Sequence, residues 1–112
     1  ESYGQNEREK QLLYGFFNHA LIKDLNIQTV YKEFPFIKEE EDKTLRGFMD
    51  LVIETHDAVY VIDYKLKSID KPYYDEQVKG YMGIMKQFSH KTIYGYLYSI
   101  VDQSFKEVKE ND

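Results

Sequence analysis

The chain has 112 residues, a net charge of −5 and no cysteine. This length predicts one domain spanning residues 1–112, and the lack of cysteine excludes disulfides, thiolate zinc sites and iron–sulfur clusters. No apolar run approaches the roughly 20 residues that span a bilayer, and no signal-peptide pattern is recognisable, so we expect a cytoplasmic domain with no membrane partner. Because the first residue is Glu1 rather than Met, we also expect a fragment of a larger chain.

The charge balance bears on the class of partner. With 15 basic and 20 acidic residues, the chain is unlike a nucleic-acid binder that is held mainly by phosphate contacts. An enzyme whose carboxylates hold a metal stays compatible with this balance, because the metal reverses the local sign of the charge. The motifs therefore have to identify the partner.

The first half of the chain predicts one helix followed by three strands. Residues 6–25 carry apolar side chains at helical spacing. Residues 29–36 read as a strand whose proline marks an edge or a bulge, and the polar residues 38–43 read as a solvated turn. Residues 45–54 and 58–67 are strong strand candidates around a short polar break.

The second half predicts a helix and a strand, with an uncertain element at the end. A proline suited to a first helical turn begins an apolar stripe over residues 72–88. Residues 92–101 form a β-branched and aromatic strand, and residues 104–109 form a short edge strand or a frayed end. The order α-β-β-β-α-β predicts an α/β fold with a mixed sheet of four to five strands flanked by helices.

The third predicted strand carries two charged residues inside an apolar run. Strand side chains alternate between the two faces, so Val61, Asp63 and Lys65 share one face. A carboxylate and an ammonium group are costly to bury on such a strand unless they serve a purpose. The preceding strand holds a second acid in a similar setting, Asp50.

The hairpin turn predicts how these acids face one another. A loop of residues 56–57, or of residues 55–58, places Asp50 directly across from Asp63, with Cβ atoms about 4.5–5.5 Å apart. A divalent cation between the two carboxylates turns their repulsion into ligation, and hard oxygen ligands suit Mg²⁺ or Mn²⁺. Lys65 would then lie near a metal-bound water. The alternative is a surface hairpin whose acids face solvent.

Gly47 lies three residues before Asp50. A glycine in a strand indicates a bulge or a close approach of another group to the backbone. A ligand phosphate is one such group, and a simple bend of the sheet is the alternative.

Five short motifs occur in the order in which one nuclease family has them. They are Gly15-Phe-Phe-Asn-His19, Glu33-Phe-Pro-Phe36, Gly47-Phe-Met-Asp50, Asp63-Tyr-Lys65 and Gln77-Val-Lys-Gly-Tyr81. Together they resemble the nuclease module of the PD-(D/E)XK superfamily, in particular the RecB-like branch at the C-terminus of AddA- and RecB-type helicase–nucleases. The resemblance implies a restriction-endonuclease-like core. It also implies that Asp50, Asp63 and the backbone carbonyl of Tyr64 ligate Mg²⁺ or Mn²⁺, while Lys65 orients and activates the attacking water.

The same resemblance implies roles for four more residues, each of which also has a structural reading. His19 would supply an imidazole ligand, or it is a histidine at the edge of the core. Glu33 would serve a second ion or the water network, or it forms a surface pair with Lys32. Gln77 and Tyr81 lie four residues apart on one helical face; they would place DNA or brace the site, or they are ordinary helix positions.

The implied function is a metal-dependent deoxyribonuclease, and specifically the exonuclease module of a helicase–nuclease in DNA repair or recombination. Its partners would be DNA and the helicase domains of the parent chain, and the iron–sulfur subtype of the branch is excluded by the lack of cysteine. The alternatives are a stand-alone endonuclease for branched or foreign DNA and a non-catalytic interaction module. A small cluster of lysines and tyrosines follows the third strand, and it either meets single-stranded DNA or is a solvated loop: Lys65, Lys67, Lys71, Tyr73 and Tyr74.

Overall fold

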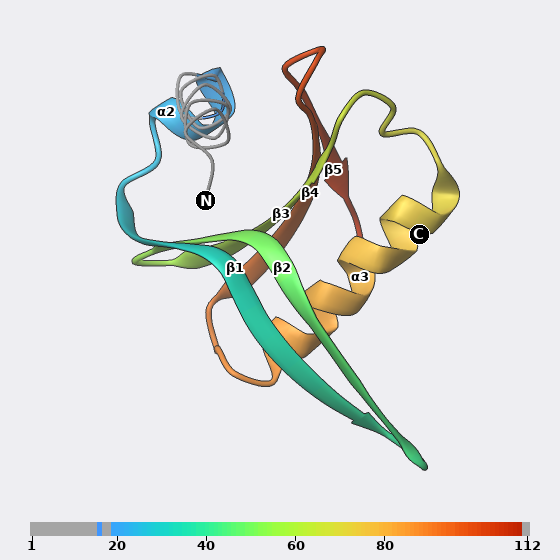
Figure 1. Cartoon of the computed structure of the whole chain (residues 1–112). Helices are drawn as coiled ribbons and strands as arrows, with labels where there is room; N and C mark the ends of the chain where they lie inside the picture. The colour runs from blue at the N-terminus through green and yellow to red at the C-terminus, as the bar shows by residue number, and fades with distance from the viewer. Residues whose placement is uncertain (1–15, 17–18, 111–112) are drawn as a thin grey trace, which may run out of the picture.

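The computed structural model describes residue 16 and residues 19–110. It contains a short helix, a long hairpin, a third strand, a long helix and two final strands (Figure 1). In chain order the elements are α2 (Ala20–Lys23), β1 (Ile27–Glu40), β2 (Lys43–Thr55), β3 (Ala58–Lys65), α3 (Pro72–Lys86), β4 (Thr92–Ser99) and β5 (Ser104–Val108). Most of the helix predicted over residues 6–25 lies outside the described residues.

The strands form one mixed sheet. Its order is β1-β2-β3-β4-β5, with β3 and β4 parallel and the other neighbours antiparallel. Helix α3 makes the connection between the two parallel strands, because parallel neighbours need a crossover that a tight turn cannot provide. The α/β prediction is confirmed, and residues 104–109 contribute a fifth strand rather than a frayed end.

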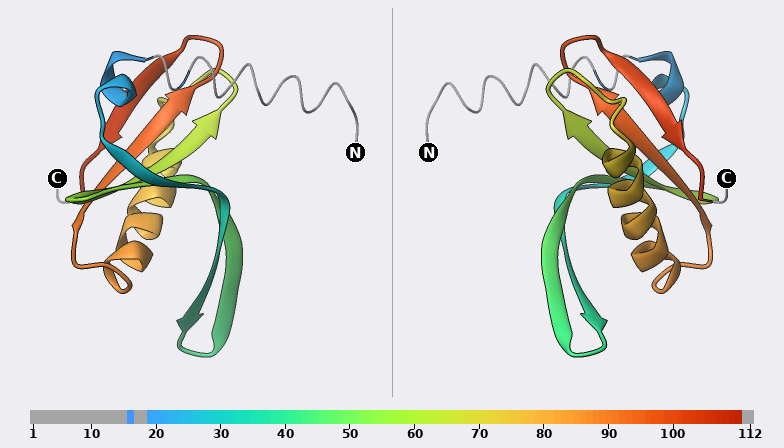
Figure 2. Two further views of the ribbon diagram at one scale, coloured as in Figure 1. Left: turned by 90° about the vertical axis from the view of Figure 1, so that its left-hand side faces the viewer. Right: turned by 90° about the vertical axis from the view of Figure 1, so that its right-hand side faces the viewer.

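The sheet is covered on both faces, which the alternation of β3 explains. Val59 and Val61 pack with α3, where they meet Val78 and Met82. The alternate residues of β3 point to the other face. Ile62 is one of them, and it packs there with α2 and with aromatic side chains of β4. Figure 2 shows α3 lying along its face of the sheet.

One glycine sets how closely α3 approaches β4. A Cβ atom placed on Gly95 would lie 2.4 Å from Met82 Sδ and 2.7 Å from Val78 Cγ1. These separations are far below van der Waals contact, so only glycine lets the helix pack this close to the centre of the strand.

The β1–β2 hairpin extends well beyond the rest of the sheet (Figure 1). Strand β3 pairs only with the part of β2 from Leu51 to Glu54, so residues 34–49 pair only with one another. The solvated turn predicted over residues 38–43 is shorter in the structure, where it is confined to residues 41–42. The strands continue to Glu40 and restart at Lys43, because the polar side chains pair across the hairpin, as in the 3.0 Å hydrogen bond from Thr44 to Glu39.

Three other predicted ends were too long by about two residues. Strand β3 ends at Lys65, helix α3 ends at Lys86 and strand β4 ends at Ser99, a margin within which element ends are ordinarily defined. Among the described residues, no helix combines the length and the apolar character that crossing a membrane requires.

Candidate active site

Asp50 and Asp63 lie where the paired part of β2 and β3 ends. The last paired residues are Leu51 and Ile62, so the two aspartates occupy the next opposed positions, in the predicted register. Beyond this last pair, a side chain rather than the backbone links the two strands: Asp50 Oδ2 accepts a 2.9 Å hydrogen bond from the backbone N–H of Tyr64. Asp63 is 4% exposed, and its charge acts directly on Asp50.

The environment of Asp50 opposes its ionisation. The pKa of Asp50 is raised to about 6, because burial and the neighbouring Asp63 carboxylate together outweigh the hydrogen bond from Tyr64 and the charge of Lys65, which lower it. Two carboxylates held this close favour a shared proton or a shared cation. The pair is therefore a centre of unbalanced negative charge.

The raised pKa of Asp50 makes the stability of the metal-free protein depend on pH. Because the folded-state pKa is about 6 and the ordinary value is 3.8, the folded chain binds more protons between these values, so this group makes the protein less stable as the pH rises through them. We expect Asp50→Asn to remove that contribution. Urea unfolding in EDTA from pH 4 to pH 7 should give a difference between parent and variant that grows with pH, with the variant the more stable.

The control for this measurement is Asp42→Asn, in the exposed turn at the tip of the hairpin. It should shift the unfolding midpoint little at any pH. A parent–variant difference for Asp50→Asn that stays constant from pH 4 to pH 7 would show that Asp50 does not titrate in this way.

Lys65 is held by three groups. Its Nζ lies 2.9 Å from Asp63 Oδ2, donates a 3.1 Å hydrogen bond to Gln77 Oε1, and lies 4.2 Å from the centre of the Tyr74 ring. Burial lowers the pKa of Lys65, but the hydrogen bond and charge of Asp63 outweigh it and the net shift is upward. Lys65 is therefore an ammonium ion at neutral pH.

Helix α3 braces this lysine with one face. Gln77 accepts from Lys65 and its Nε2 donates a 3.1 Å hydrogen bond to the hydroxyl of Tyr81. The Tyr81 ring lies 5.5 Å from that of Phe36 in the hairpin, and burial together with the charge of Asp63 raises the pKa of its hydroxyl. Because Gln77 and Tyr81 are one helical turn apart, the helix places both toward the aspartates.

The donor set suits a divalent cation. Asp63 Oδ2 is buried, and the ammonium of Lys65 lies 2.9 Å from it. One ammonium ion cannot balance two neighbouring carboxylates, and hard carboxylate oxygens are the ligands that Mg²⁺ or Mn²⁺ prefers. Among the described residues no third His, Cys, Asp or Glu joins the two aspartates, so backbone carbonyl and water oxygens would have to complete the coordination.

Comparison with known families adds an independent observation. The model of the family described as "PD-(D/E)XK nuclease superfamily" matches residues 3–110. The chain belongs to the PD-(D/E)XK nuclease superfamily. In the comparison with curated proteins, nothing matches the chain.

Membership in the PD-(D/E)XK superfamily agrees with the fold. The five-stranded mixed sheet, in which α3 connects the parallel strands β3 and β4, is a restriction-endonuclease-like core, as predicted. Members of this superfamily are nucleases that generally use divalent metal ions, usually Mg²⁺, and DNA is the implied substrate.

The structure does not bring His19 to the two aspartates. Its ring lies 4.6 Å from the ring of Phe105 on β5, and Phe16 packs nearby on Phe105 and Tyr98. This aromatic cluster covers the face of the sheet opposite α3, whereas Lys65 contacts both Asp63 and Gln77 on the α3 side.

Glu33 lies level with Asp50 on the neighbouring strand. The pairing passes from Lys32–Leu51 to Phe34–Met49, so Glu33 and Asp50 occupy the opposed positions between them. Glu33 has a φ of 53° and is exposed. Its left-handed backbone conformation interrupts the alternation of β1, and Phe34 packs against the cluster under α3.

Gly47 is explained by an aromatic side chain rather than by a ligand. A Cβ atom at Gly47 would lie 2.8 Å from the ring of Phe36, its partner across the hairpin. The close approach predicted from the glycine exists, but the group that approaches Gly47 is the Phe36 ring and not a ligand phosphate.

Tyr74 is a site neighbour to which the sequence analysis gave no separate role. It lies three residues before Gln77 on the same helical face, and its ring contacts the ammonium of Lys65. The signal was the spacing of Tyr74, Gln77 and Tyr81 along α3, which places all three on the stripe that faces β3.

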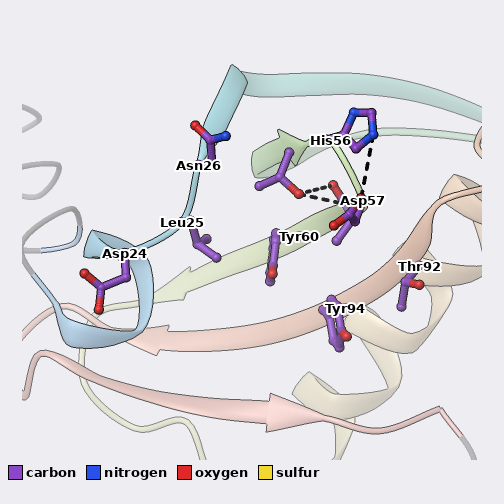
Figure 3. A pocket seen from close by; sticks show the side chains of 10 residues that line it. Asp24, Leu25, Asn26, His56, Asp57, Tyr60, Thr92 and Tyr94 are labelled. Atoms are coloured by element: carbon purple, nitrogen blue, oxygen red, sulfur yellow. Dashed lines mark hydrogen bonds and ion pairs between the residues drawn. The ribbon is translucent and has the colours of Figure 1, made fainter.

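A cavity of about 370 Å³ lies elsewhere, beside the turn between β2 and β3 (Figure 3). Tyr60, Tyr94, Asp24 and Asp57 are among its lining residues. It opens where β3 begins, whereas Asp63 and Lys65 are at the opposite end of that strand. None of the predicted site residues lines it.

Proposed function

We propose that the chain is a metal-dependent deoxyribonuclease whose active site is built from Asp50, Asp63 and Lys65. The observation that carries the proposal is the convergence of two buried or half-buried carboxylates at the end of the β2–β3 ladder, with an ammonium ion 2.9 Å from one of them. Superfamily membership supplies the reaction class, hydrolysis of a phosphodiester bond.

Each residue has a separable task in this proposal. Asp50 and Asp63, with the backbone carbonyl of Tyr64, would hold Mg²⁺ or Mn²⁺, which when bound makes water more acidic and offsets phosphate charge. Lys65 is cationic, so it orients the attacking water and stabilises the negative charge that grows on the phosphoryl oxygens rather than accepting a proton. Gln77 holds the lysine in place, and Tyr81 holds Gln77.

Metal dependence is the first test. We expect Mg²⁺ or Mn²⁺ to support cleavage of linear DNA, and excess EDTA to abolish it. Ca²⁺ should bind but support little or no cleavage, because its looser coordination places the water poorly. An Asp63→Asn preparation, purified and assayed in parallel, measures contaminating nuclease. Undiminished cleavage in EDTA would contradict the metal assignment.

We further propose that the chain is the exonuclease module of a RecB-like helicase–nuclease, acting beside helicase domains of a longer protein in DNA repair or recombination. The support is the order of the five motifs, including Gly15-Phe-Phe-Asn-His19 and Glu33-Phe-Pro-Phe36. An acidic nuclease domain fits this setting, because the helicase domains would supply most of the phosphate contacts.

His19 tests this branch assignment. An imidazole must be neutral to ligate a metal, so we expect the Mn²⁺ affinity of the parent to fall toward acidic pH. His19→Ala should weaken binding and reduce this dependence between pH 5 and pH 7, as measured by calorimetry. His56→Ala and His90→Ala, both at exposed positions, are the matched controls. If His19→Ala binds Mn²⁺ like the parent at every pH, His19 is a packing residue against Phe105.

A further inference from the structure

An exposed aromatic ring adjoins the proposed active site at the start of α3. Tyr73 is 65% exposed, although burying a tyrosine ring is ordinarily favourable. Its ring lies 4.8 Å from that of Tyr74, whose ring in turn lies 4.2 Å from Lys65 Nζ. Only the Tyr74 ring thus separates the solvent-exposed Tyr73 ring from the proposed catalytic ammonium of Lys65.

The segment that presents this ring is basic in an acidic chain. Residues 64–74 contain three lysines and one aspartate, whereas the whole chain has a net charge of −5. Lys71 Nζ lies 5.9 Å from the centre of the Tyr74 ring, and Lys67 and Lys71 are both exposed. Within the described part of the chain, neither of these two lysines forms an ion pair with a carboxylate.

An exposed tyrosine near lysines that form no ion pair is a combination that binds a nucleotide outside a base pair. The π-face of the ring stacks on a base of any sequence, and the ammonium groups meet the flanking phosphates. Bases inside a duplex are already stacked on their neighbours and cannot offer a face to a side chain without being extruded. The ligand that fits Tyr73 is therefore a base of a single strand or of a frayed end.

We propose that Tyr73, with Lys71, forms a stacking ledge that receives an unpaired base of the DNA strand whose phosphate reaches Lys65. The proposal rests on the proposed function for the location of the reacting phosphate, and it adds the substrate class, a single-stranded DNA segment. Tyr74 links the two sites, because it contacts Tyr73 on one side and Lys65 on the other.

The test compares Tyr73→Ala and Tyr73→Phe. The probes are a fluorescein-labelled oligodeoxythymidylate and a blunt duplex of the same length, titrated in Ca²⁺ and followed by anisotropy. Tyr73→Ala removes the stacking of a base on this ring, so it should weaken single-strand binding by roughly fivefold or more. Tyr73→Phe keeps the ring and should stay within about twofold of the parent, and neither variant should change duplex binding.

Phe88→Ala is the matched control, because Phe88 is 70% exposed and lies just beyond the other end of α3. It should leave both affinities unchanged. Thermal unfolding of each variant separates a folding defect from a binding defect. Unchanged single-strand binding by a folded Tyr73→Ala variant would overturn the proposal, as would an equal loss on the duplex; either result would leave the ring as a contact for another protein.

The binding assay needs no catalysis, so the two proposals fail separately. If no DNA is cleaved with Mg²⁺ or Mn²⁺ and Tyr73→Ala still loses single-strand affinity, the ledge stands and the nuclease proposal falls. If the parent cleaves DNA and Tyr73→Ala binds the oligonucleotide as the parent does, the ledge falls and the nuclease proposal stands.

Discussion

Asp63→Asn is expected to cost the protein both its divalent-metal affinity and its DNA cleavage. Asp63 is 4% exposed and lies opposite Asp50 at the end of the β2–β3 ladder, so a cation bound there would offset the charges of both carboxylates. An amide carries no charge and offers one acceptor oxygen in place of two. With each 1.36 kcal/mol of lost stabilisation slowing the reaction tenfold and a metal ion supplying several kcal/mol, cleavage should fall on the order of a thousandfold.

The same substitution should not destabilise the metal-free fold at neutral pH. Asparagine removes the repulsion between Asp63 and Asp50, which contributes to the raised pKa of Asp50, so we expect the thermal midpoint in EDTA to rise. Calorimetry with Mn²⁺, cleavage assays and thermal unfolding measure the three effects. Asp57→Asn, at the exposed turn between β2 and β3, is the control for charge alone. Metal affinity retained by a folded Asp63→Asn variant would contradict the assignment.

Lys65→Ala is expected to remove turnover and leave metal affinity nearly intact. Lys65 contacts the proposed metal site through the 2.9 Å ion pair with Asp63, and it would act on the water and the phosphoryl oxygens. Removing one group that stabilises developing charge costs about 10²–10³ in kcat. Loss of the ammonium also leaves the aspartates without a competing cation, so Mn²⁺ should bind at least as tightly as in the parent.

The division of roles is tested by measuring both variants side by side. Lys109→Ala, which removes an exposed lysine paired with Glu107, controls for the change in net charge. If Lys65→Ala and Asp63→Asn lose metal affinity to the same degree, the lysine and the aspartate do not have the separate tasks proposed here.

The part of the site on β2 and β3 was predictable because it depends on local geometry. A short turn fixes the register of a hairpin, and the alternation of a strand fixes the face of each side chain, so the opposition of Asp50 and Asp63 followed from residue numbers alone. The helical spacing of Gln77 and Tyr81 placed them on one face for the same reason. The structure adds the bond from Lys65 to Gln77, which depends on how α3 packs on β3.

The parts that sequence did not predict depend on contacts between distant elements. The position of His19 follows from how the first helix meets Phe105, a residue at the far end of the chain. The Phe36 ring fills the space at Gly47 because the hairpin curls toward Tyr81. The polar residues near the hairpin tip have a turn-like composition, yet they extend as strands because each one finds a partner opposite it.

The backbone of β1 has a further consequence for the behaviour of the chain at high concentration. β1 is an edge strand of the sheet, and an uninterrupted edge strand invites edge-to-edge pairing with another chain and eventual aggregation. Pro35 has no N–H to donate, and the left-handed φ of Glu33 breaks the extended run two residues earlier. Together they divide a 14-residue edge into two short pieces, neither of which offers a long template for strand addition.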